Sequence, residues 1–209
     1  MANMNLRIDS TVMITTQCSA GCQHCPYSNP QLKKLFLNVK TVKQLVDENS
    51  KGKTLTVLSG GELFEHPKIK EILEELINST GPFRIASGGF VDLSPWINQL
   101  RTLSDTKRSL QGISMGTDIL SSRVNHSNWV PTWVNNIQLL SQSQISYSLT
   151  LSLPNDLVFS HFDIWRWMDY FDSKPAFIYI LHHAEEHINE LTKKIKSTFC
   201  KVPIIYDTL

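Results

Sequence analysis

Apolar and polar residues follow one another along the chain in two periods, which predict short strands separated by longer helices. Strands are indicated by runs of β-branched and aromatic residues, and helices by apolar residues three or four positions apart. The carboxyl ends of the strands lie about 30 to 40 residues apart, the length of a strand plus a crossover helix. The predicted strands are Thr11–Thr16, Thr54–Leu58, Phe83–Ser87, Gln111–Met115, Ile145–Leu153 and Ala176–Leu181, with a terminal strand at Val202–Tyr206.

The clearest amphipathic helix is predicted over Pro67–Asn78. Its apolar residues share one face and its lysines and glutamates take the other. Pro67 suits the first helical position, and Gly81 follows the end of the pattern. Further helices are expected from Ser94 onward, around Trp133 to Leu140, over 162–171 and over 184–198.

This alternation of strands and helices implies an α/β fold with a parallel sheet covered by helices. Six such units form either part of a TIM-like barrel or an open doubly wound sheet. In both architectures the chemistry lies at the carboxyl ends of the strands. The chain has 209 residues, enough for one sizeable domain and too few for two ordinary ones, so residues 1–209 are expected to form a single domain.

The composition narrows the class of protein. Hydrophobic residues make up 41% of the chain and charged residues 19%, proportions typical of a soluble globular protein. The net charge of +1 gives no reason to expect nucleic acid or an acidic membrane surface as a partner. No apolar run approaches the ~20 residues that span a bilayer, and no signal-peptide pattern opens the sequence. A cytoplasmic protein is expected.

Three of the four cysteines, Cys18, Cys22 and Cys25, lie within eight residues directly after the first predicted strand. Their C-x3-C-x2-C spacing indicates a metal site rather than a disulfide framework. Three thiolates on a [4Fe–4S] cube leave one iron open for a small molecule. The alternative is zinc held with His24 or Cys200, although zinc sites usually contain a second pair of ligands. Cys200 is otherwise expected to be an ordinary thiol.

A second motif, Ser59-Gly60-Gly61-Glu62, follows the second predicted strand. Two glycines permit positive φ and close approach of the backbone to a ligand, and Glu62 can bind a cation or an amino group. The alternative is an ordinary turn between strand and helix. Glu65 and His66, just beyond the motif, are interpreted as loop residues at the start of the next helix.

The two motifs together resemble the radical S-adenosylmethionine (SAM) superfamily, whose signature is C-x3-C-x2-C. An aromatic residue commonly precedes the last cysteine there, and His24 is a frequent alternative. The resemblance implies a parallel-sheet partial TIM barrel, the (β/α)6 radical SAM core, over nearly the whole chain. It also implies a [4Fe–4S] cluster on the three cysteines and SAM as a second cofactor.

The same resemblance implies roles for individual residues around SAM. Gly60, Gly61 and Glu62 would recognise its amino group, and His24 would offer backbone atoms to its adenine. Ser114 and Asp118, at the end of the fourth strand, would contact the ribose and carboxylate, with capping or turn roles as the alternative. The implied activity is reductive cleavage of SAM, which gives a radical that abstracts hydrogen from a substrate.

The motif segments look most like radical SAM enzymes that modify peptides and proteins. The resemblance implies maturation of a ribosomally made peptide, with a separate precursor-binding protein and an electron donor such as flavodoxin or ferredoxin. A C-terminal cysteine-rich domain, common among such enzymes, is absent from this sequence. Three alternatives remain open: a small-molecule enzyme similar to the deazaguanine synthases, an activating enzyme for glycyl-radical proteins, and a non-catalytic cluster-binding partner protein.

Overall fold

The computed structural model describes residues 8–22, 25–105, 109–116, 129–153, 175–176, 178–182 and 202–208. The chain divides into two compact units. The first comprises Met1–Ser87 and Pro95–Ile113, and the second comprises Gly88–Ser94 and Ser114–Leu209. Among the described residues, no helix is both long and apolar enough to cross a membrane.

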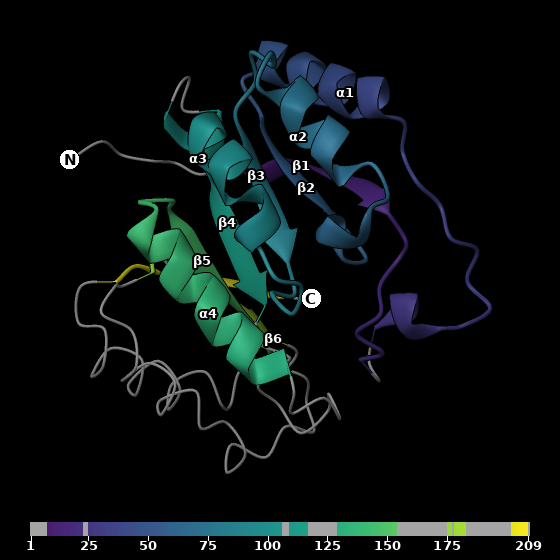
Figure 1. Cartoon of the computed structure of the whole chain (residues 1–209), viewed down its shortest axis with the longest axis vertical. Helices are drawn as coiled ribbons and strands as arrows, with labels where there is room; N and C mark the ends of the chain where they lie inside the picture. The colour runs from purple at the N-terminus through teal and green to yellow at the C-terminus, as the bar shows by residue number, and fades with distance from the viewer. Residues whose placement is uncertain are drawn as a thin grey trace. The chain divides into compact units, whose positions relative to one another are not determined.

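The first unit is built on three parallel strands, in which β1 pairs with β2 and β2 with β3. Helices α1 and α2 connect these strands and lie side by side over them (Figure 1). In the described part of the chain, short 3-10 turns lie between these elements, and η3 begins at Ser94, the last residue of a segment assigned to the second unit. The elements in chain order are β1 Ile8–Thr15, η1 Pro26–Ser28, α1 Val39–Lys51, β2 Leu55–Gly60, η2 Leu63–Glu65, α2 Ile69–Leu76, β3 Phe83–Ser87, η3 Ser94–Trp96 and α3 Ile97–Asp105.

The core of the first unit lies between these strands and helices. Each α-helix contributes an apolar stripe at three- and four-residue spacing, and each strand contributes alternate residues. Burial of each such large side chain stabilises the fold by roughly 1.5–3 kcal/mol. The buried residues include Val12, Ile14, Val42, Val46, Leu58, Ile72, Leu73, Leu76, Phe83 and Ile85.

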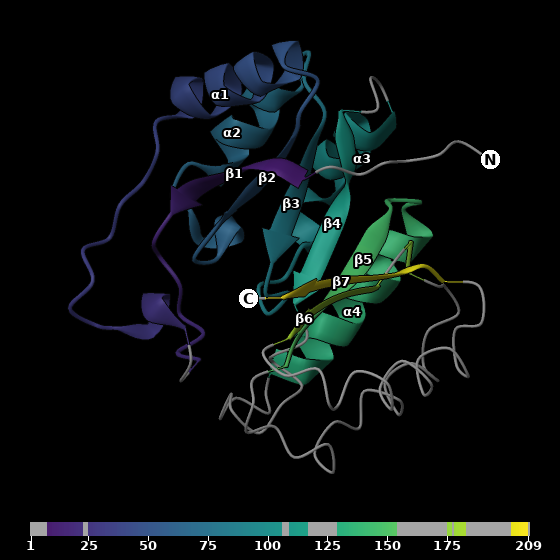
Figure 2. The same cartoon turned by 180° about the vertical axis from the view of Figure 1, so that it is seen from behind.

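The second unit repeats the parallel arrangement. β5 Tyr147–Leu153 pairs with β6 Ile178–His182, which pairs with β7 Ile204–Thr208 (Figure 2). Helix α4 Trp129–Gln142 packs on β5. Strand β4, Leu110–Gly116, begins in the first unit and ends in the second.

The structure confirms the parallel α/β pattern and all of the predicted strands, with ends shifted by a few residues. Its main addition is α1, a helix that the sequence analysis did not name. The signals for it are present, because Asn38 caps the helix through its side chain and Val42 and Val46 are spaced for burial. The helices predicted over 162–171 and 184–198 lie outside the described residues.

The ends of the predicted Pro67–Asn78 helix need correction. The helix covers Ile69–Leu76, so Pro67 precedes it rather than occupying its first position. Gly81 is not a helix cap. A Cβ at Gly81 would lie 2.4 Å from the carbonyl oxygen of Val46, so the absence of a side chain lets the chain pass close to α1.

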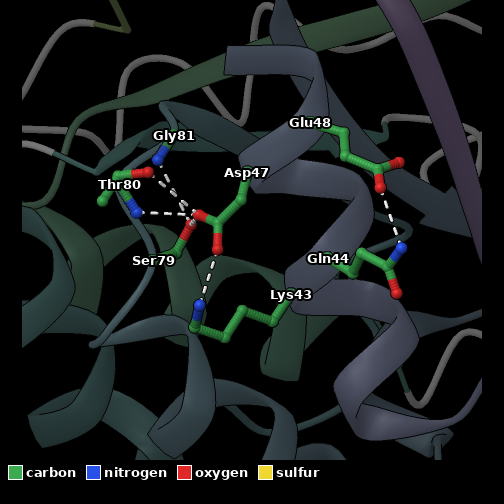
Figure 3. A network of polar contacts seen from close by, with 7 residues as sticks. All are labelled: Lys43, Gln44, Asp47, Glu48, Ser79, Thr80 and Gly81. Carbon is green, nitrogen blue, oxygen red and sulfur yellow. Dashed lines mark hydrogen bonds and ion pairs between the residues drawn. The ribbon is translucent and has the colours of Figure 1, made fainter. Parts of the chain in front are cut away.

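A polar network around Asp47 holds α1 to the turn that enters β3 (Figure 3). Its Oδ2 accepts from Lys43 Nζ at 2.6 Å, and its Oδ1 accepts from Ser79 Oγ at 2.7 Å and from the Thr80 backbone at 2.8 Å. Burial raises the pKa of Asp47, but the hydrogen bonds from Lys43, Ser79 and Thr80 outweigh it and hold that pKa well below its usual range. The carboxylate therefore stays ionised and stabilises the packing of α1.

Replacing Asp47 with Asn removes the charge that Lys43, Ser79 and Thr80 share, and we expect the free energy of unfolding to fall by about 1–2 kcal/mol. Because the folded pKa is depressed, the stabilisation is complete above the unfolded pKa of about 3.9 and declines as the pH falls below it. Urea unfolding at several pH values measures both effects.

The matched control is Glu48→Gln on the same helix. Glu48 is exposed and accepts only from Gln44 in Figure 3, so its replacement should change the stability by no more than about 0.5 kcal/mol. Equal effects of the two substitutions would contradict the role given to Asp47.

Candidate functional site

The loop that carries the three cysteines begins where β1 ends, and it is closed at its base. Thr16 N donates to Leu35 O at 3.0 Å, and Leu37 N donates to Ile14 O at 2.8 Å. The side chain of Thr16 adds to this closure, because its hydroxyl donates to Lys33 O and accepts from Leu35 N. The returning segment therefore fixes both ends of the cysteine loop against β1.

Inside the loop the three cysteines are reduced and half-buried. Cys25 N donates to Cys22 O at 3.0 Å, so the backbones of the second and third cysteines lie close together. The Ser28 hydroxyl donates to Cys25 O at 2.6 Å at the start of η1. Gly21 has φ +61, a conformation that glycine adopts without strain. The backbone thus holds Cys22 and Cys25 near each other.

The Gly60-Gly61-Glu62 segment is hydrogen-bonded directly to the start of the cysteine loop. Gly61 N donates to Thr15 O at 2.8 Å, and Glu62 N donates to Gln17 O at 2.7 Å. Gly60 has φ +133, and a Cβ on it would lie 2.1 Å from Thr15 O; a Cβ on Gly61 would lie 2.1 Å from Gln17 O. The close approach expected of these glycines is present, and the group they approach here is the backbone of the cysteine loop.

Glu62 is fully buried at the end of β2. Its Oε1 accepts from Phe64 N at 3.1 Å, and both carboxylate oxygens accept from the hydroxyl of Ser87, at 3.0 and 3.1 Å. Ser87 is the last residue of β3. The carboxylate is thus fixed between the carboxyl ends of two strands, and a buried carboxylate is favoured by a cationic partner.

Glu65 contacts the cysteine loop, although the sequence analysis assigned it only a loop role. Its Oε1 accepts from Ser19 N at 3.2 Å and from the Ser19 hydroxyl. Ser19 directly follows Cys18. The sequence signal nearest to this contact is the three-residue spacing of Glu62 and Glu65, which places both carboxylates in one short segment.

The electrostatic environment of Cys18 disfavours an isolated thiolate. Burial raises the pKa of the Cys18 thiol to about 12; a hydrogen bond involving the Ala20 backbone opposes this, while Glu62, Glu65 and Cys25 add to it. A thiolate at this position therefore requires a cation beside it. Metal coordination supplies such a cation and deprotonates the thiol.

His66 anchors the segment that returns from the cysteine loop. It is buried, its Nδ1 accepts from Lys68 N at 3.0 Å, and its Nε2 lies 3.1 Å from Leu37 O. Because Lys68 N must donate to Nδ1, the ring proton lies on Nε2 and is donated to Leu37. Burial lowers the pKa of His66, so the ring stays neutral at neutral pH. His66 therefore precedes α2, as predicted, and also binds the backbone of the segment that returns from the cysteine loop.

Of the other residues predicted to bind SAM, Ser114 lies in the second unit, and His24 and Asp118 lie outside the described residues. The Ser114 hydroxyl lies 2.7 Å from Thr150 Oγ1 and accepts from Ser148 Oγ at 3.2 Å, so β4 and β5 share a hydroxyl network. The contact of Ser114 with SAM stays a prediction. Cys200 also lies outside the described residues.

The glycine pair that follows β3 packs against α4 within the second unit. Asn136 donates to Gly89 O at 2.8 Å and accepts from Leu93 N at 2.9 Å. A Cβ on Gly89 would lie 2.5 Å from Met115 Cε. Gly89 therefore has a packing role in the described structure.

The donor set of the cysteine loop fits a [4Fe–4S] cluster with three thiolate ligands. It comprises three half-buried thiols on one closed loop, with two carboxylates beside the first of them. Within the described residues, no three histidine, cysteine or acidic side chains converge as ligands of a single metal ion. Coordination by Cys18, Cys22 and Cys25 therefore stays a prediction.

Comparisons with known proteins bear on this site. No protein-family model matches the chain. YydG of Bacillus subtilis (strain 168), whose name assigns it to peptide biosynthesis, is 30% identical over 87 residues, which cover 40% of this chain and 27% of YydG.

Solved structures match nearly the whole chain. Streptococcus suis SuiB bound to S-adenosylmethionine has a TM-score of 0.70 and 9% identity, over 96% of this chain and 50% of SuiB. SuiB bound to its precursor peptide SuiA has a TM-score of 0.71 and 9% identity, over 95% of this chain and 48% of SuiB. A radical SAM methyltransferase from Sphaerobacter thermophilus has a TM-score of 0.67 and 14% identity, over 95% and 66% of the two chains.

These similarities confirm the predicted fold. The chain has the parallel-sheet, partial TIM-barrel fold of radical SAM enzymes. It spans about half the length of SuiB and 27% of YydG.

Replacing Gly61 with Ala places a methyl group against the carbonyl of Gln17, and the backbone of the cysteine loop must move to accommodate it. We expect a loss of roughly 1–3 kcal/mol in the free energy of unfolding, the usual effect of overpacking a tight contact. Thermal and urea unfolding measure it. Gly52→Ala is the control, because its Cβ would lie 3.3 Å from the nearest backbone atom; an equal loss in both variants would contradict the tight contact at Gly61.

Proposed function

We propose that this chain, which has the fold of the radical SAM enzymes, holds a [4Fe–4S] cluster on Cys18, Cys22 and Cys25 and cleaves SAM to begin hydrogen abstraction. The observation that carries the proposal is the direct hydrogen bonding between the Gly60-Gly61-Glu62 turn and the cysteine loop. The contacts from Gly61 to Thr15 and from Glu62 to Gln17 join the two motifs at the carboxyl ends of β1 and β2, which supports the proposal that both belong to one cofactor site.

The residues of the site have distinct tasks in this proposal. When bound, the cluster supplies the electron that splits a carbon–sulfur bond of SAM. The three thiols would hold it, and one iron would have no ligand from these cysteines. Glu62 offers a negative charge to the amino group of SAM, and its hydrogen bonds to Ser87 and Phe64 N keep that charge in place before a ligand binds. Gly60 and Gly61 allow the two motifs to meet.

Three further residues are proposed as contacts of SAM on the strength of the family resemblance: His24, Ser114 and Asp118. The hydroxyl of Ser114 already takes part in a network with Thr150, so it is oriented by its neighbours. Because this hydroxyl is already oriented, it can exchange one hydrogen-bond partner for a ribose or carboxylate oxygen with little loss of conformational entropy.

We further infer that the substrate is a peptide. Support comes from the name of YydG, which assigns that protein to peptide biosynthesis, and from the structural similarity to SuiB bound to its precursor peptide. A separate precursor-binding protein and an electron donor such as flavodoxin or ferredoxin belong to the same proposal. So does a cytoplasmic setting, where clustered thiols remain reduced.

Anaerobic reconstitution with iron and sulfide, followed by dithionite and SAM, tests the first proposal. We expect about four irons per chain, since one cube has four, and the formation of 5′-deoxyadenosine. Cys22→Ala should lose the cluster and the product, whereas Cys200→Ala, the control, should retain both. Glu62→Gln should keep the cluster but bind SAM roughly tenfold more weakly, which corresponds to about 1.4 kcal/mol. Zinc in place of iron would contradict the proposal.

Transfer of deuterium tests the substrate class. A short peptide encoded beside the gene, synthesised with deuterated side chains, should pass deuterium into 5′-deoxyadenosine when incubated with the reconstituted enzyme, because the radical takes hydrogen from its substrate. Mass spectrometry of both products measures the transfer. A peptide of the same composition in scrambled order is the control. Transfer from a small metabolite but not from the peptide would exclude the peptide assignment.

A further inference from the structure

The two oxygens of the Glu65 carboxylate have different surroundings. Oε1 accepts from the backbone N–H of Ser19 at 3.2 Å and from the hydroxyl of the same residue. Oε2 is shielded from solvent and accepts no hydrogen bond within the described part of the chain. One carboxylate thus combines a strong anchor to the cysteine loop with an oxygen whose hydrogen-bonding capacity is unused.

A shielded carboxylate oxygen without a donor is costly. The loss amounts to roughly 1–3 kcal/mol, and more for a charged group, so such an oxygen in a folded protein requires an explanation. The Glu65 charge acts on the Cys18 thiol, so a cation held by the cysteines would lie within electrostatic range of this carboxylate. Glu65 ends the 3-10 turn that Glu62 caps, and the residue it anchors is bonded directly to Cys18.

The anchor also restrains Cys18 from two sides. Gln17, the residue before it, accepts from Glu62 N, and Ser19, the residue after it, donates to Glu65. Both contacts come from the same short segment, residues 62–65. The first cysteine of the motif is therefore held by η2 and the residue that caps it, in addition to its own loop.

We propose that Glu65 is a positioning residue for the cluster, which fixes Cys18 through Ser19 and lowers the reduction potential of the bound cluster by its fixed negative charge. The inference rests on the proposed function, since it concerns the cluster that Cys18 would hold. A negative charge near a cluster disfavours the added electron, and net charge and hydrogen bonding are among the factors that set cluster potentials. Glu65 lies within electrostatic range of the Cys18 thiol.

The potential of the reconstituted cluster tests the role of the charge. Glu65→Gln keeps the shape of the side chain and an acceptor for Ser19 but removes the charge. We expect full cluster content and a reduction equilibrium shifted up to about tenfold toward the reduced state, which is 59 mV for a one-electron couple. Glu71→Gln is the matched control, because it removes the same charge from an exposed position on α2; it should leave the potential unchanged.

Hydrogen exchange tests the anchor without a cluster. In the metal-free chain, Glu65→Ala should increase exchange in the peptide that contains the Ser19 amide, and Glu65→Gln should increase it much less. Two results would overturn this inference alone. The first is a loaded Glu65→Gln variant with the same reduction potential as the loaded wild-type protein. The second is a Ser19 amide that exchanges at the same rate in Glu65→Ala as in the wild-type chain. A wild-type chain that takes up no cluster would overturn the proposed function and this inference together.

Discussion

The site depends on one backbone contact, the approach of the Gly60-Gly61-Glu62 turn to the residues that lead into the cysteine loop. Two hydrogen bonds form there, from Gly61 to Thr15 and from Glu62 to Gln17, and any side chain at either glycine would collide with a carbonyl oxygen at 2.1 Å. The thiols, the buried Glu62 carboxylate and the Glu65 anchor all take their places from this contact. The parallel sheet provides the setting, because it brings successive strand ends to one edge.

The two carboxylates near the thiols, Glu62 and Glu65, have different surroundings and different roles. Glu62 is fully buried and held by Ser87 from the next strand, which suits a charge awaiting a cationic ligand. Glu65 points to the loop itself and holds the residue after Cys18. Their charges raise the pKa of the Cys18 thiol, so a thiolate at this position requires a cationic partner.

Much of the fold follows from the sequence because its elements are repeated and strongly patterned. The β-branched runs predicted β1 to β7, and the apolar spacing predicted α2 and α4. Helix α1 was missed although it has a capping Asn38, because its few apolar residues are separated by charged and polar ones. The thiols and Glu62 were predicted from residue type and spacing, whereas the contact of Glu65 with Ser19 joins residues 46 positions apart and leaves only a faint local signal. Packing reasons for glycines, as at Gly81, are equally invisible without the facing backbone.

The closure of the cysteine loop at its base affects the free-energy cost of binding a cluster. The contacts of Thr16 with Leu35 and of Leu37 with Ile14 are made by backbone atoms, so folding of the chain itself brings the two ends of the loop together. Under the proposed function, a cluster would therefore bind to a loop whose ends are already joined, and its binding would not carry the entropy cost of closing that loop.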